Sequence, residues 1–180
     1  MIIDLTKTIA DGMPVYEGDP QVSLTKIADI NHDGYQNYQL NVNMHAGTHV
    51  DGLAHMLAHK PLISEYPLDR FIGRARYVTD ELPYINLGES IVVVKMALET
   101  LNPSFVDAII KANIKMVVTD KESVDQSPYL THKKLFSSDI MIVENALDID
   151  RLKTIQSFTL YAIPLKVSAD SAPVRLFAIY

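Results

Sequence analysis

The chain contains neither cysteine nor tryptophan among its 180 residues. Without cysteine there are no disulfides, no thiolate metal ligands and no cysteine nucleophile, so nitrogen and oxygen atoms must hold any metal. Without tryptophan, an aromatic ligand would have to stack on tyrosine or phenylalanine. The candidates near the histidine-rich segment described below are Tyr16, Tyr66 and Phe71.

Positive charge and long apolar runs are also scarce. Sixteen lysine and arginine residues face 22 aspartate and glutamate residues, giving a net charge of −6, and the densest basic cluster is Lys133-Lys134. Because phosphate binding needs a positive face, we expect no nucleic acid partner. No apolar run approaches the ~18 residues of a membrane span, and the N-terminus lacks the pattern of a signal peptide. We therefore expect no membrane association, and the composition fits a cytoplasmic protein.

Apolar periodicity and turn signals predict a chain of mixed strands and helices, most simply one domain over residues 1–180. Strands are expected at 2–5, 22–28, 35–44, 74–79, 90–96, 115–119, 140–143, 158–167 and 174–180. Helices are expected at 103–111, from 132 and at 149–155. The turn at 31–34 predicts a hairpin, and residues 90–119 predict a right-handed βαβ unit.

Residues 45–55 read His-Ala-Gly-Thr-His-Val-Asp-Gly-Leu-Ala-His and hold three of the six histidines. Imidazole and carboxylate are ligands that zinc and other first-row divalent cations prefer, so His45, His49, Asp51 and His55 are candidate ligands. On a helix, Asp51 would point away from the first two histidines. On a straight strand, the Cα atoms of His45 and His49 would lie ~13 Å apart.

Neither regular element brings all four side chains to one small ion. Gly47 and Gly52 allow the chain to bend, so we predict a bent loop that follows a strand. The alternative for each histidine is an ordinary hydrogen-bonded or solvated side chain. Three histidines and one aspartate within eleven residues favour a metal site over that alternative.

The segment His-x-Gly-Thr-His-x-Asp, followed four residues later by His, resembles the signature of the putative cyclase family, which includes bacterial kynurenine formamidase (arylformamidase) and isatin hydrolase. Further matches run from residue 4 to residue 175: Asp-Leu at 4–5, Gly-Asp-Pro at 18–20, His-Lys-Lys-Leu at 132–135, Val-Glu-Asn at 143–145 and Asp-Ser-Ala-Pro-Val-Arg at 170–175. The chain has Glu17, Leu53 and Glu122 where the family usually has proline.

The resemblance implies an α/β fold: a single domain of the swivelling β/β/α type with a mixed sheet and a βαβ unit. It also implies a homodimer or higher homo-oligomer. For the second half of the site it implies His132, whose alternative is a helix-start residue, and Glu144, whose alternative is an exposed acid at a strand end.

The expected cofactor is Zn²⁺ or Mn²⁺, one or two ions per chain. We assign His45, His49 and Asp51 to one ion, and Asp51, His132 and Glu144 to the other. The resemblance favours His55 as the general acid/base, with a ligand role as the alternative. The implied reaction is hydrolysis of a small-molecule amide, either an aryl formamide or a cyclic amide. The metal, and a backbone N–H or Ser123, would hold the oxyanion.

Two other functions fit parts of the same pattern. His49, Asp51 and a distant His132 match the two-histidine, one-carboxylate triad of non-haem iron oxygenases, although that function leaves His45 and His55 unused. The other possibility is a non-catalytic metal-binding module, which the three replaced prolines keep open.

Overall fold

The computed structural model describes residues 1–81 and 83–180. The strands are β1 (Ile2–Asp4), β2 (Ser23–Ala28), β3 (Asn37–Asn41), β4 (His49–Asp51), β5 (Ile72–Thr79), β6 (Ile91–Lys95), β7 (Met116–Thr119), β8 (Met141–Glu144), β9 (Phe158–Pro164) and β10 (Ser171–Ile179). The α-helices are α1 (Ile30–Asp33), α2 (Pro103–Lys111) and α3 (Leu130–Ser137), and short 3₁₀ turns occur at Leu53–His55, Ile63–Glu65, Leu68–Phe71 and Ile149–Leu152.

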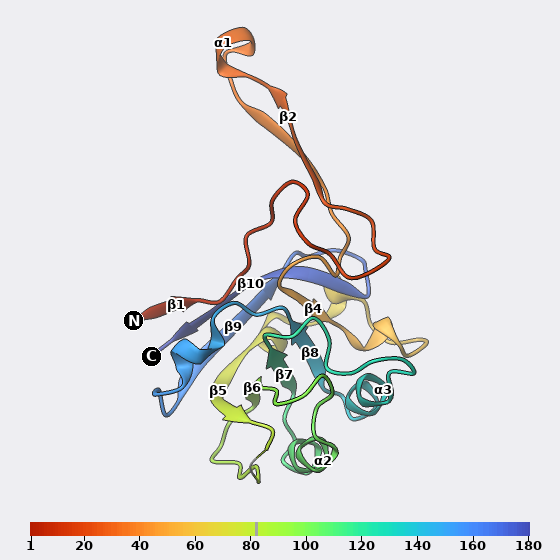
Figure 1. Ribbon diagram of the computed structural model, residues 1–180, viewed down its shortest axis with the longest axis vertical. Helices are drawn as coiled ribbons and strands as arrows, with labels where there is room; N and C mark the ends of the chain where they lie inside the picture. The colour runs from red at the N-terminus through yellow and green to blue at the C-terminus, as the bar shows by residue number, and fades with distance from the viewer. Residues whose placement is uncertain (82) are drawn as a thin grey trace.

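The main sheet closes on itself through β10, so that its strands other than β1 form a barrel-like ring (Figure 1). Its order is β1-β10-β4-β8-β7-β6-β5-β9, with a further pairing between β10 and β9 that completes the ring. The strands β5, β6, β7 and β8 are parallel neighbours, and the remaining pairs are antiparallel. The expected α/β fold with a mixed sheet is confirmed, as is the βαβ unit formed by β6, α2 and β7.

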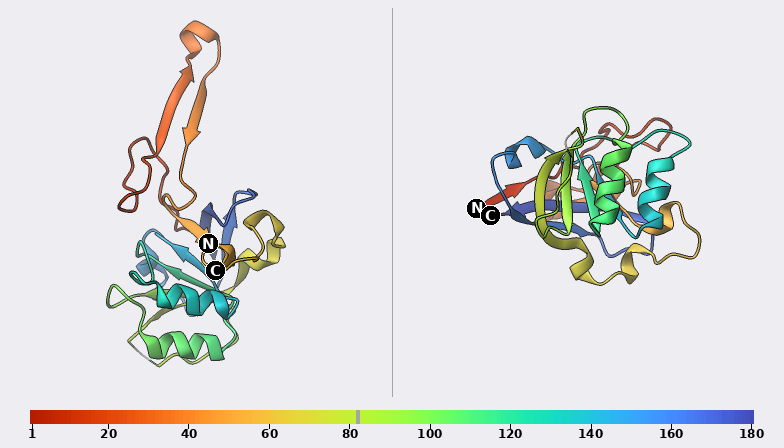
Figure 2. Two further views of the ribbon diagram at one scale, coloured as in Figure 1. Left: turned by 90° about the vertical axis from the view of Figure 1, so that its right-hand side faces the viewer. Right: turned by 90° about the horizontal axis from the view of Figure 1, so that it is seen from below.

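The sequence of β6 shows how this sheet is buried on both faces. Ile91 and Val93 pack inside the ring, whereas Val92 and Val94 pack under the helices. Both helices α2 and α3 lie on the same side of the sheet, where Figure 2 shows them next to each other. A parallel strand that is covered on both faces reads as a continuous apolar run, which explains the Ile-Val-Val-Val segment.

Residues 23–41 form an arm that projects from the rest of the chain (Figures 1 and 2). The predicted hairpin is confirmed, because β2 and β3 pair antiparallel, and α1 forms the tip. The prediction that the second strand runs into His45 is wrong: β3 ends at Asn41, and residues 42–48 form no strand. Every residue of β3 is exposed, so its alternating pattern buries neither face.

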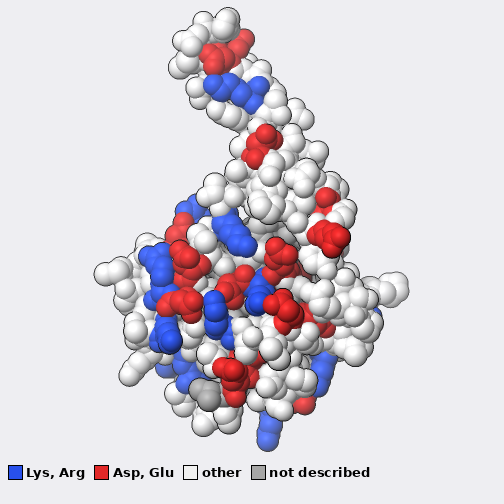
Figure 3. Space-filling model, viewed as in Figure 1, with Lys and Arg blue, Asp and Glu red and all other residues white. Residues whose placement is uncertain are grey.

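Residues 149–155 do not form the predicted helix. A 3₁₀ turn, Ile149–Leu152, is present instead, and two buried side chains, Ile149 and Leu152, anchor it. The described helices include none that is long and apolar enough to cross a membrane. On the face shown in Figure 3, lysine and arginine side chains are interspersed with aspartate and glutamate rather than gathered into a basic patch.

Candidate metal centre

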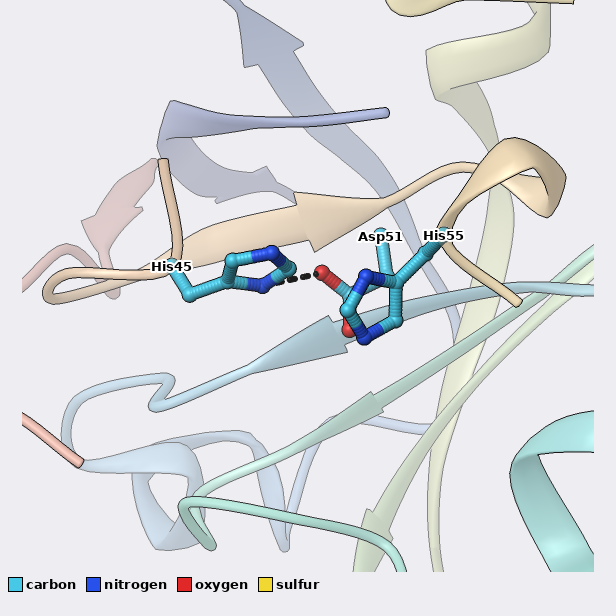
Figure 4. A group of neighbouring side chains, drawn as sticks. All are labelled: His45, Asp51 and His55. Atoms are coloured by element: carbon cyan, nitrogen blue, oxygen red, sulfur yellow. Dashed lines mark ion pairs between the residues drawn. The ribbon is translucent and has the colours of Figure 1, made fainter. Parts of the chain in front are cut away.

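The short strand β4 and the turns on either side of it carry the first half of the site (Figure 4). His49 and Asp51 alternate with Val50 along β4 and therefore point to the same side of the sheet. His45 precedes the strand in a turn, and His55 ends the 3₁₀ turn that follows it. The chain bends around the site as predicted, but the bend does not follow a strand directly: strand β4 lies inside the histidine-rich segment.

Two glycines make this bend possible. Gly47 has a φ of +67°, in the left-handed region that other residues rarely adopt. Gly52 has an ordinary φ of −80°, but a Cβ atom there would lie 2.8 Å from the carbonyl oxygen of Asp170. The Gly52 N–H also donates to that oxygen at 2.9 Å. Gly52 therefore lets the segment that carries Asp170 approach the turn that carries His55.

Strand β8 and helix α3 supply the second half of the site. Strand β8 pairs antiparallel with β4 in a register that sets Glu144 directly opposite His49, so the two side chains are neighbours. Glu144 Oε1 accepts a hydrogen bond from the Val124 N–H at 3.0 Å and lies 3.2 Å from His132 Nε2. His132 is the third residue of α3 and is buried.

The six predicted site residues line one cavity of about 520 Å³. They are His45, His49, Asp51, His55, His132 and Glu144. Two groups of potential ligand atoms occur in the described chain, and within each group the atoms lie less than 4.8 Å apart: one from His45, Asp51 and His55, the other from His49, Asp51 and Glu144. Asp51 belongs to both groups. His132 belongs to neither group, but its Nε2 lies 3.2 Å from Glu144 Oε1. The division of ligands between two ions stays a prediction.

The contacts of His49 show why this cluster suits a cation. Its Nδ1 donates to the carbonyl oxygen of Gly47 at 2.9 Å, and its Nε2 faces the carboxylates of the site. That Nε2 lies 3.4 Å from Asp51 Oδ1 and 3.6 Å from Glu144 Oε2. Both His49 Nε2 and Asp51 Oδ1 are buried and form no hydrogen bond of good geometry, although His45 Nδ1 and Asp51 Oδ1 form an ion pair at 3.0 Å (Figure 4). Imidazole nitrogens and carboxylate oxygens that converge in a buried site match the donor set of a bound divalent cation.

The pKa values of the two carboxyl groups shift in opposite directions. Burial opposes ionisation of Asp51, but the imidazoles of His49 and His45 outweigh it and hold the pKa well below its usual range. Burial raises the pKa of Glu144, and the nearby charge of Asp51 raises it further. Two adjacent buried carboxylates are costly unless positive charge compensates them. A bound cation would supply that charge.

Two aspartates orient histidines of the site. Asp125 accepts a hydrogen bond from His132 Nδ1, and Asp170 accepts one from His55 Nδ1 at 2.8 Å. Burial lowers the pKa of His132, but hydrogen bonds to Asp125 and Glu144 outweigh it and raise the pKa to about 9. The sequence alone predicted no role for either aspartate. The family-like segment at 170–175 held a signal for Asp170, whereas Asp125 lies seven residues before His132 with no spacing rule to mark it.

The predicted oxyanion donor and the predicted aromatic residues do not all take part in the cavity. The Ser123 hydroxyl donates to the carbonyl oxygen of Asp125 at 2.6 Å, so its proton is not available to an oxyanion. Tyr16 lines the cavity as expected, together with Tyr129, which no sequence pattern marked. Phe71 is buried in the core and Tyr66 packs against that core, so neither belongs to the cavity wall.

The three residues that replace family prolines lie in different parts of the structure. Glu122 lines the cavity, whereas Leu53 is buried in the core beneath α2 and α3. Glu17 is exposed and is not part of the cavity wall. Of the three departures from the family pattern, Glu122 is therefore the one that reaches the site.

The sequence is similar to one family model and to two proteins of nearly the same length. A sequence model of the putative cyclase family matches residues 3–83. The chain is 31% identical over 193 residues to an uncharacterized protein of Methanocaldococcus jannaschii, MJ0783, covering 99% of this chain and 98% of that protein. It is 27% identical over 205 residues to a kynurenine formamidase of Salinibacter ruber, covering 97% of this chain and 95% of that protein.

A solved structure shares the fold. The crystal structure of an isatin hydrolase bound to the product analogue thioisatinate superimposes with a TM-score of 0.85 at 18% identity, covering 99% of this chain and 92% of that one. The match of the family model includes residues 45–55 but ends before His132 and Glu144. The two full-length relatives extend over both halves of the site.

Proposed function

Because the chain belongs to the putative cyclase family, as its sequence motifs predicted, we propose that it is a metal-dependent hydrolase that cleaves an amide bond. The substrate would be a small molecule, either an aryl formamide or a cyclic amide. The relative from Salinibacter ruber is by name a formamidase, and the structural neighbour is by name a hydrolase of isatin. Both names support hydrolysis of an amide, one open and one cyclic.

The observation that carries this proposal is the set of buried imidazole and carboxylate atoms that converge in the cavity. His49 Nε2 and Asp51 Oδ1 are buried without a hydrogen bond of good geometry, and a Glu144 oxygen lies 3.6 Å from the first of them. Nitrogen and oxygen donors of this kind fit Zn²⁺ or Mn²⁺, one or two ions per chain. A bound ion of this kind supplies Lewis acidity, which lowers the pKa of water to about 7 and polarises a carbonyl group.

His55 has the hydrogen-bond arrangement that a general base needs. Its Nδ1 donates to Asp170, whose pKa burial would raise, but the hydrogen bond from His55 and the charge of His45 lower it. With the proton on Nδ1, Nε2 is free to accept a proton from the attacking water and to pass it to the leaving nitrogen. Asp170 would hold the ring in this tautomer. The proximity of His55 to His45 and Asp51 also suits a ligand role, which a substitution can separate from the acid/base role.

The chain's other residues would bind the rest of the substrate. Tyr16 and Tyr129 give the cavity aromatic walls, and Met13, Val15 and Met56 add apolar surface. The volume of about 520 Å³ lies within the range of small-molecule sites, roughly 300–1,000 Å³. These walls support an aryl substrate over a purely aliphatic one.

One experiment distinguishes the proposed hydrolase from the two alternatives that the sequence left open, an iron oxygenase and a non-catalytic metal-binding module. Metal-loaded protein is incubated with an aryl formamide and, separately, with a cyclic amide, with and without oxygen, and before and after chelation. We expect release of formate that does not need oxygen and stops when a chelator removes the metal. Turnover only with oxygen would support the iron oxygenase, and absence of turnover of both open and cyclic amides would support a binding module.

Three further expectations accompany this proposal. The protein would act without nucleic acid or membrane partners, as a homodimer or higher homo-oligomer, in the cytoplasm. Sedimentation of the purified protein tests the oligomeric state, and a mass equal to one chain would contradict it.

A further inference from the structure

Lys7 brings a positive charge to a cavity whose other charged walls include several carboxylates. It is the one lysine or arginine among the described residues that line this space. The carboxylates are those of Asp19, Asp51, Glu122 and Glu144. The hydrolysis proposed above does not use the ammonium group of Lys7.

Hydrogen bonds hold Lys7 against both halves of the site. Its backbone N–H donates to Thr48 Oγ1 at 2.8 Å, and the Thr48 hydroxyl donates to the carbonyl oxygen of Asn145 at 2.7 Å. Thr48 directly precedes His49, and Asn145 directly follows Glu144. Lys7 is therefore fixed relative to the candidate metal ligands and forms a defined part of the cavity wall.

The ammonium group of Lys7 has a neutral partner. Its Nζ donates to Asn145 Oδ1 at 2.7 Å, and Lys7 forms none of the ion pairs found among the described residues. By contrast, Lys95, Lys121 and Lys134 each pair with a carboxylate within 2.6 Å. An ammonium group has three protons to donate, and a charge that is partly withdrawn from water is costly without a counterion. Lys7 is thus prepared to receive an anion from the cavity.

We propose that Lys7 binds a carboxylate group of the substrate, so that the amide cleaved by this chain is a carboxylated aryl amide. This inference rests on the proposed function and narrows its substrate class. The apolar and aromatic wall that would face the ring consists of Met13, Pro14, Val15, Tyr16, Met56 and Tyr129. An aryl ring against this wall and a carboxylate at Lys7 would orient the scissile amide toward the metal ligands.

The kinetic test uses two formamides that differ by a single carboxylate, 2-formamidobenzoate and formanilide. We expect wild-type, metal-loaded protein to prefer the carboxylated substrate. In Lys7→Met, the ratio of kcat/KM for the two substrates should fall about 10- to 100-fold, mainly through KM, because a charge-assisted hydrogen bond is lost. Lys7→Arg keeps the charge and should retain most of the preference. An unchanged ratio in Lys7→Met would overturn the proposal.

Lys153→Met is the matched control. Lys153 is exposed and does not line the cavity, so this variant has the same change in net charge without the change at the site. Its substrate preference should equal that of wild type. Metal content and thermal unfolding of each variant show whether Lys7→Met still folds, and if it does not, Lys7→Arg and Lys7→Gln replace it in the comparison.

A binding measurement separates this inference from the proposed function. Titration of metal-loaded protein with fluorescent 2-aminobenzoate should give a dissociation constant that rises about 10- to 100-fold in Lys7→Met, while aniline binds weakly to both. If neither these formamides nor a cyclic amide is hydrolysed but 2-aminobenzoate binding depends on Lys7, the proposed function fails and the anion site stands. If 2-aminobenzoate binds Lys7→Met as tightly as wild type, or binds wild type no better than aniline, the anion site is refuted.

Discussion

The segment at 45–55 and the arm at 23–41 are close neighbours in the chain, yet they bury their side chains to opposite degrees. Residues 46–53 are all buried, including His49 and Asp51, whereas every residue of β3 in the arm is exposed. Tyr38 and Leu40 of the arm are 50% and 45% exposed. In Figure 1 the arm extends away from the sheet that holds the histidine-rich segment.

This difference shows what each kind of sequence pattern can predict. Alternating apolar residues predict the paired strands of the arm correctly, but they do not show whether another surface covers those strands, and no alternation marks β4 within residues 45–55. Histidine and aspartate next to strained or closely packed glycine predict a site, because such residues are costly to bury without a function. The following substitutions test whether the two regions are as different in function as they are in burial.

The largest effect is expected from Asp51→Ala. Asp51 belongs to both groups of potential ligand atoms, so its removal should lower metal affinity by more than ~100-fold and abolish turnover at the same time. Elemental analysis and amide hydrolysis measure the two effects. Full metal content in Asp51→Ala would contradict the assignment of this residue.

Asp80→Ala separates this effect from general damage. Asp80 is also a buried carboxylate, but it accepts hydrogen bonds from the backbone N–H groups of Ala97 and Asn102, outside the cavity. Its loss should lower the free energy of unfolding and leave the metal bound. Loss of metal from both variants would mean that metal content reports stability rather than ligation.

His55→Ala should lower turnover ~10²–10⁴-fold while the metal remains, since the variant loses the acid/base group but not a ligand. His32→Ala, which removes an exposed histidine at the tip of the arm, should change neither quantity. An empty site in His55→Ala would show that His55 is a metal ligand, and the proton-transfer role would then belong to another group.

Asp125→Asn should weaken metal binding by ~10–100-fold, because Asp125 orients the ring of His132 without belonging to either group of potential ligand atoms.

The pKa of about 9 for His132 makes metal affinity depend on pH. His132 must lose a proton before Nε2 can bind a cation, so metal affinity in wild type should fall as the pH decreases below about 9. In Asp125→Asn this decline should begin at a lower pH. Titrations at several pH values check both statements, and identical curves would contradict them.

The smallest effect is expected from the arm variant Tyr38→Ser with Leu40→Ser. Residues 23–41 contribute none of the described side chains that line the cavity, so metal content should equal that of wild type. Elemental analysis of this variant beside Asp51→Ala gives the comparison directly. A loss of metal would show that the arm contributes to a site, in its own chain or in a second copy.

The sequence predicted the fold well where periodicity was strong. The apolar run of β6, the capped helix α2 and the following strand β7 were all identified, because local pattern and burial agree there. The helix predicted at 149–155 failed, because two buried side chains stabilise a 3₁₀ turn as well as they would a helix. The sequence could not show that β10 closes the ring, since that contact joins segments far apart in the chain.

The two halves of the site also differed in how well local sequence patterns predicted them. His45, His49, Asp51 and His55 are marked by their own spacing, so elementary chemistry was enough to select them. Glu144 stands beside His49 because of the register between β4 and β8, which no local pattern reveals. Residues that orient ligands, such as Asp125, were missed for the same reason.

The metal content of the purified wild-type protein tests the central claim most directly. Elemental analysis, before and after dialysis against Zn²⁺ or Mn²⁺, should give one to two divalent ions per chain, because buried ligand atoms of His49, Asp51 and Glu144 converge at one point in the cavity. Protein that contains no metal and takes up none on reconstitution would contradict the account.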